Sequence, residues 1–94
     1  MDIKPRFDFF PTYKSGSLPD WLPHESISAQ LGFEPETDPD DDGKVTMQWD
    51  FTVDGFPCSI WDYKGVRWST FGPEKAFRAL FNSYEHGCYA RTAA

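Results

Sequence analysis

Apolar and polar side chains alternate along residues 44–64, and this alternation is the clearest structural signal in the chain. The apolar positions of its first half are Val45, Met47, Trp49, Phe51 and Val53. A period of two residues is typical of a strand with one buried face. Asp54 and Gly55 then supply the residues that a type I′ turn prefers. The pattern predicts a hairpin with three facing pairs: Val53 with Phe56, Phe51 with Cys58, and Trp49 with Ile60.

A second turn is predicted at Lys64 and Gly65, which brings residues 66–70 back as a third strand. In this register three further pairs of residues face each other across the strands: Trp61 with Trp68, Tyr63 with Val66, and Asp62 with Arg67. We expect the Trp and Tyr side chains of these pairs on the sheet face opposite the apolar one. We interpret Asp62 and Arg67 as a cross-strand ion pair rather than as a catalytic acid and its neighbour.

Two helices are predicted on either side of this meander. Pro23 suits the first turn of a short helix, and Gly32 is placed to end it. Ile27 and Leu31 lie one turn apart on its apolar face. A second helix begins at residues 72–74 and carries one apolar stripe, with Gly87 near its end: Ala76, Phe77, Leu80, Phe81 and Tyr84. This stripe is expected to cover the apolar face of the sheet.

The predicted fold class is α+β, with a short N-terminal helix, a three-stranded antiparallel meander and a C-terminal helix packed on one sheet face. Ninety-four residues indicate a single domain, 1–94. Its expected segments are an aromatic and proline-rich arm with the short helix (1–33), an acidic loop (34–43), the meander (44–71) and the final helix (72–87). A short strand is expected around residues 7–10.

Acidic side chains are gathered in one place. Six of the fifteen carboxylates fall within nine residues: Glu34, Glu36, Asp38, Asp40, Asp41 and Asp42. The remaining carboxylates are matched by nine Lys and Arg, so the net charge of -6 comes from this segment. Pro35 and Pro39 disfavour a helix or a strand ladder here, which predicts a solvated loop. Its role stays open between solubility, a cation site and a negative surface that binds a basic partner.

Several function classes are disfavoured by the composition. A phosphate-backbone binder needs clustered Lys and Arg, so direct binding of nucleic acid is not expected. The sequence has no apolar run long enough for a membrane span and no signal peptide, which indicates a cytoplasmic protein. In that reducing compartment Cys58 and Cys88 are expected to stay unpaired.

Metal and nucleophile signatures are incomplete. Residues 38–43 begin like a calcium loop, but Trp49 stands where the closing bidentate Glu is needed. The Cys and His residues that might ligate zinc lack the usual spacing: Cys58, Cys88, His24 and His86. Cys58 also has no positioned base, since it falls on the apolar face. We therefore expect no catalytic residue, metal or cofactor.

A second candidate site lies on the aromatic sheet face. Its members are Trp61, Tyr63, Arg67 and Trp68, close to Lys64 and to the start of the final helix. Aromatic rings stack on bases, while cations and a helix N-terminus hold an anion, so this set would suit a nucleotide-like ligand. The competing interpretation is that the aromatic N-terminal arm covers these rings.

The C-terminal half has a familiar pattern. It consists of residues 51–65 (FTVDGFPCSIWDYKG), residues 68–73 (WSTFGP) and the helix through Leu80 and Phe81. This pattern resembles small proteins encoded by bacteriophages and prophages. The resemblance implies an accessory protein that binds and blocks a host protein, such as a defence nuclease or a CRISPR effector. Carboxylates on such a protein can imitate a nucleic-acid backbone.

Two hypotheses follow. In the first, the chain is a non-enzymatic phage protein whose acidic loop binds a host protein with a basic surface, as an anti-CRISPR protein would. In the second, it binds a nucleotide-like anion on the aromatic face. The sequence leaves open whether the protein forms a homodimer.

Overall fold

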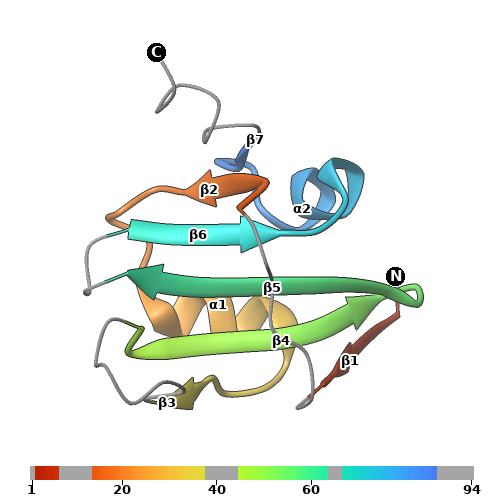
Figure 1. Ribbon diagram of the computed structural model, residues 1–94, viewed down its shortest axis with the longest axis horizontal. Helices are drawn as coiled ribbons and strands as arrows, with labels where there is room; N and C mark the ends of the chain where they lie inside the picture. Colours follow the sequence, from red (N-terminus) through yellow and green to blue (C-terminus); the bar gives the residue numbers. More distant parts are fainter. Residues whose placement is uncertain (1, 7–13, 38–44, 64–66, 87–94) are drawn as a thin grey trace.

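An antiparallel sheet with two helices on one face forms the described part of the chain, which comprises residues 2–6, 14–37, 45–63 and 67–86 of the computed structural model (Figure 1). The coarse α+β prediction is confirmed. The described strands number seven rather than three: β1 (Ile3–Pro5), β2 (Gly16–Leu18), β3 (Glu36–Thr37), β4 (Met47–Val53), β5 (Phe56–Tyr63), β6 (Arg67–Phe71) and β7 (Glu85–His86). The helices are α1 (His24–Leu31) and α2 (Glu74–Leu80).

The β4–β5 hairpin forms as predicted. Val53 pairs with Phe56, and the other expected pairs follow: Phe51 with Cys58 and Trp49 with Ile60. Asp54 and Gly55 both adopt left-handed backbone conformations, with φ of 51° and 88°. A type I′ turn requires positive φ at both central positions, so the Asp-Gly dipeptide sets the hairpin register.

The predicted register of the third strand is wrong by one residue. Asp62 pairs with Trp68 and Trp61 with Ser69, because three residues rather than two separate β5 from β6. Successive side chains in a strand point to opposite faces, so this shift moves Trp68 to the face that carries Ile60. The predicted turn residues, 64 and 65, lie outside the described residues.

Four short strands extend the meander on both sides. The order across the sheet is β1-β4-β5-β6-β2-β7, and β3 pairs with β4 beside β1. The N-terminal segment was expected to be an arm, but two of its parts are strands: β1 at one edge and β2 between β6 and β7 (Figure 1). The strand expected around residues 7–10 lies outside the described residues.

Helix α1 has the predicted bounds. Gly32 ends it with φ of 91° and donates its N–H to the Ser28 carbonyl oxygen at 2.8 Å. Helix α2 is shorter than predicted, because Phe81 is already extended. The chain then turns through Tyr84 into β7, so the predicted stripe is divided between a helix and the segment after it. Gly87, expected near the helix end, lies outside the described residues.

The core lies between the sheet and the two helices. Phe51 of β4 meets Phe77 of α2 edge-on with centroids 6.2 Å apart, which joins the sheet to a helix. Within the sheet, Trp49 of β4 meets Trp68 of β6 with centroids 5.5 Å apart. Trp49 also donates its indole N–H to the Ser28 hydroxyl of α1 at 3.3 Å. Helices and meander are therefore held by a shared aromatic core.

The opposite sheet face is polar. One row of paired residues crosses six strands, from β7 to β3: Glu85, Ser17, Ser69, Trp61, Gln48 and Glu36. A neighbouring carboxylate, Asp50, is only 5% exposed. It accepts hydrogen bonds from the Gln48 amide at 2.9 Å and the Ser59 hydroxyl at 2.7 Å. Burial raises the pKa of Asp50 above its ordinary value.

Candidate functional site

The acidic segment is described only in part. Glu34 and Glu36 are exposed, and Glu36 lies on β3 at the edge of the sheet beside Gln48. Asp38, Asp40, Asp41 and Asp42 lie outside the described residues, as does the calcium-like segment 38–43. The two described carboxylates place the start of the acidic segment at the β3 edge.

The aromatic candidate site is divided between the two sheet faces. Trp61, Tyr63 and Arg67 occupy positions on the polar face, whereas Trp68 points into the core and is 9% exposed. The indole of Trp68 packs against Trp49. Since one of the two expected stacking rings is inside the protein, the four residues do not form one ligand surface.

The predicted register, with Arg67 directly opposite Asp62, is wrong. The Asp62 carboxylate accepts the backbone N–H groups of Thr46 at 2.9 Å and Met47 at 2.8 Å, and it also accepts the Thr46 hydroxyl. The one-residue shift in register places Trp68, not Arg67, opposite Asp62. Asp62 therefore fixes the start of β4, which is a structural role.

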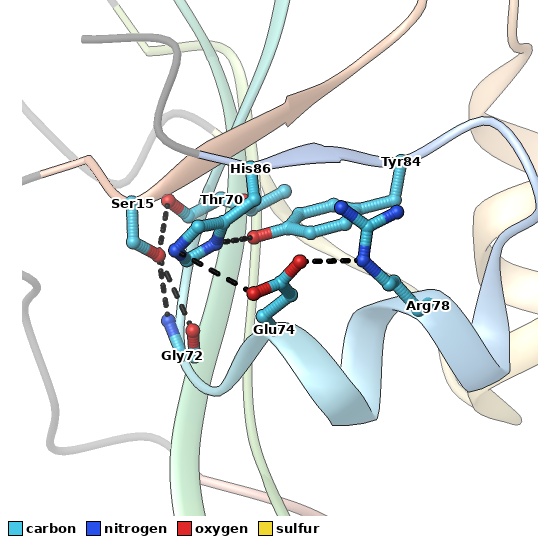
Figure 2. Close-up of polar contacts among 7 residues, drawn as sticks. All are labelled: Ser15, Thr70, Gly72, Glu74, Arg78, Tyr84 and His86. Atoms are coloured by element: carbon cyan, nitrogen blue, oxygen red, sulfur yellow. Dashed lines mark hydrogen bonds and ion pairs between the residues drawn. The ribbon is translucent and has the colours of Figure 1, made fainter. Parts of the chain in front are cut away.

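A polar cluster joins α2 to β7 (Figure 2). Tyr84 is 4% exposed, and its ring stacks on Phe77 with centroids 5.2 Å apart. Its hydroxyl lies 2.8 Å from His86 Nδ1, and His86 Nε2 lies 4.0 Å from Glu74 Oε1. Which of the two groups donates in the Tyr84–His86 hydrogen bond depends on the tautomer of His86.

Charges within this cluster are matched. Arg78 donates to Glu74 Oε2 at 2.6 Å, and this hydrogen bond lowers the pKa of Glu74. Burial raises the pKa of Tyr84, which keeps its hydroxyl neutral and able to donate. The cluster anchors β7 to α2, because Glu74 and Arg78 of α2 and Tyr84 and His86 at β7 form one chain of polar contacts.

This anchoring directs Glu85 to the other side of β7. Tyr84 and His86 point towards α2, as Figure 2 shows, and the residue between them lies opposite Ser17 of β2. Beside this pair is a groove of about 290 Å³, lined by residues 17–21, Ser83 and Glu85. We call it the β2–β7 groove.

Trp21 forms one wall of the β2–β7 groove. Its side chain is 73% exposed, the highest value among the large apolar residues that the structure describes. The turn that carries it is fixed, since Leu22 donates its N–H to the Pro19 carbonyl at 3.1 Å. The Leu22 carbonyl in turn accepts the Trp68 indole N–H at 2.7 Å. An exposed indole is thus held on a rigid turn.

The charge of the groove is acidic. Asp20 and Glu85 contribute carboxylates, and the described residues of its lining include no Lys, Arg or His. Such a lining favours a cationic group and disfavours a phosphate. Sequence reasoning missed this site, because β2 and β7 are too short to show a strand pattern. An unexplained Trp between Pro19 and Pro23 was the one signal in the sequence.

Metal and thiol chemistry find little support in the described residues. No group of three or more His, Cys, Asp or Glu side chains converges among them. Cys58 is buried, and this burial raises the pKa of its thiol to about 12, which suppresses the nucleophilic thiolate. Cys88 lies outside the described residues.

Comparisons with protein-family models, curated proteins and solved structures found no match for this chain. Within the described residues, none of the helices has the length and apolar character needed to cross a membrane.

Proposed function

We propose that this chain is a small acidic binding protein of bacteriophage origin, without enzymatic activity. It binds a basic surface on a host protein and thereby inhibits that protein. A defence factor or another protein that handles nucleic acid would offer such a surface. The acidic segment 34–42 is the main contact in this proposal, and imitation of a nucleic-acid backbone is one way in which it would act.

The observation that carries the proposal is the placement of acidic charge at both edges of the sheet. Glu36 on β3 and Glu85 on β7 end the same cross-strand row and are both exposed. Five strand spacings separate them, which is about 24 Å. Between these ends the row is largely buried, at Ser17, Ser69 and Gln48, so a basic surface would contact the carboxylates along the two edges, and the acidic segment continues from one of them.

Charge-neutralised variants test the proposal. Immobilised wild-type protein is exposed to host lysate, captured proteins are identified by mass spectrometry, and association with the isolated partner is timed at low and high salt. The variant Asp40→Asn/Asp41→Asn/Asp42→Asn should associate more slowly and lose most of the salt dependence, because charge governs the encounter rate. An equally fast, equally salt-sensitive variant would contradict the proposal.

A matched control removes three exposed carboxylates elsewhere: Asp2→Asn, Glu25→Gln and Asp54→Asn. It has the same net charge as the first variant. If both variants slow association equally, total charge rather than the acidic segment determines binding, and the assignment of that segment as the contact is wrong.

A further inference from the structure

We infer that the β2–β7 groove binds the guanidinium group of an arginine side chain. The inference rests on the proposed function in one respect, since the basic partner would supply that arginine. It adds a defined pocket and a ligand chemistry to a proposal that otherwise depends on net charge.

The exposed Trp21 indole provides the first recognition element. A planar guanidinium stacks on an aromatic face and is attracted by the electron density of the ring. Trp is the best of the aromatic side chains for this contact. The backbone of the turn around Trp21 is already ordered through the Leu22 and Trp68 hydrogen bonds, so a ligand that stacks there does not have to order it.

Carboxylates provide the second element. Glu85 is exposed on β7 and lines the groove, and its side chain makes no ion pair within the described part of the chain. A carboxylate accepts two parallel N–H groups from one guanidinium, a geometry that an ammonium cannot reproduce. Asp20 adds a second negative charge to the same lining.

Hydroxyl groups provide the third. Ser17 is 5% exposed and lines the groove, yet its hydroxyl has no hydrogen-bond partner among the residues that the structure describes. Ser83 brings a second hydroxyl to the lining. Guanidinium has five N–H donors, so it can use such acceptors after the carboxylate is satisfied.

The size of the groove agrees with a single side chain. Its volume of about 290 Å³ lies at the lower limit of small-molecule pockets, which extend from about 300 to 1,000 Å³. A nucleotide would need more space and would bring phosphates against Asp20 and Glu85. An arginine side chain that enters from a partner surface meets neither difficulty.

The test uses the whole protein and a capped amino acid, N-acetyl-arginine amide, titrated while the indole N–H signals of the four Trp residues are followed by NMR. The control ligand is N-acetyl-citrulline amide, which has nearly the same shape but a neutral urea group. We expect the arginine compound to shift the Trp21 signal with saturation, and the citrulline compound to bind at least about tenfold more weakly.

Two substitutions assign the site. Trp21→Ala and Glu85→Gln should each weaken arginine binding by about tenfold or more while the fold is retained, since both side chains are exposed. Phe56→Ala, at an exposed ring outside the groove, and Glu25→Gln, at an exposed carboxylate outside it, should bind like wild type. Equal binding of arginine and citrulline, or unchanged binding in both groove variants, would overturn the inference.

The outcome is separable from that of the proposed function. Arginine binding that is lost in the groove variants supports the inference even if no basic host protein is captured. Capture of a basic protein by a chain whose groove ignores arginine supports the proposed function and rejects the groove as its arginine site.

Discussion

The indole N–H of Trp68 donates a hydrogen bond to the Leu22 backbone carbonyl oxygen at 2.7 Å. The bond links the third strand of the meander to the turn that displays Trp21, and so it connects the core to the β2–β7 groove. The same indole that was expected on a ligand-binding face instead supports a site on another part of the surface.

Replacement of this donor should be measurable. Trp68→Phe keeps an aromatic ring but leaves the Leu22 carbonyl without its partner and removes buried volume. We expect a loss of about 1–3 kcal/mol in the free energy of unfolding, measured by urea titration. Trp21→Phe, at a side chain 73% exposed, should change it by less than about 0.5 kcal/mol. Equal effects of the two substitutions would contradict the support role of Trp68.

A Cβ atom at position 16 should disturb the junction of β2 and β7. It would lie 2.6 Å from the Glu85 carbonyl oxygen and even closer to the Tyr84 hydroxyl oxygen. Gly16→Ala is therefore expected to cost about 1–3 kcal/mol of stability through overpacking. Ser17→Ala, one residue along the same strand, should cost little, and a stable Gly16→Ala protein would show that β7 can move away from β2.

The free energy of unfolding should depend on pH through Asp50, and the contribution of this residue should decrease as the pH rises. Burial raises the pKa of Asp50, so the folded state holds the proton more tightly than the unfolded state. The stabilisation is complete below the ordinary carboxyl pKa and is lost as the pH rises through the raised, folded-state pKa. Asp50→Asn should remove this component, so the stability of wild type relative to the variant should fall with rising pH. Urea unfolding of wild type and Asp50→Asn across the acidic pH range measures this difference in stability. If the stability of wild type relative to the variant rises with pH, the raised pKa of Asp50 is refuted.

Cys58 should resist alkylation in the folded protein. With its pKa raised to about 12, about one thiol in ten thousand is ionised at pH 8, and the side chain is also buried. Iodoacetamide treatment followed by peptide mass spectrometry should leave Cys58 unmodified until denaturant is added. Rapid native modification at this position would show that the hairpin opens readily.

Local patterns in the sequence predicted the central hairpin and α1 well. An Asp-Gly turn between alternating residues determines its own register, and Gly32 ends α1 by a local hydrogen bond. The register between β5 and β6 depends on the length of the turn that joins them, and a single extra residue in this turn moves Trp68 from the predicted sheet face to the other.

Tertiary pairing explains what the sequence did not predict. β1, β2, β3 and β7 have two or three residues each, too few for any periodicity, and they are strands because β4, β6 and β2 offer them partners. Tyr84 fits the helical stripe that begins at Phe77, yet a turn after Phe81 also buries it. Periodicity alone does not separate these two outcomes.

The position of β2 between β6 and β7 also makes the sheet depend on contacts between distant parts of the chain. Gly16 takes His86 as its strand partner, although the two residues are 70 positions apart in the sequence. Contacts this distant along the chain slow folding, because a large loop must close before they form. The groove with Trp21 on one side and Glu85 on the other therefore forms only after two segments distant in the sequence have met.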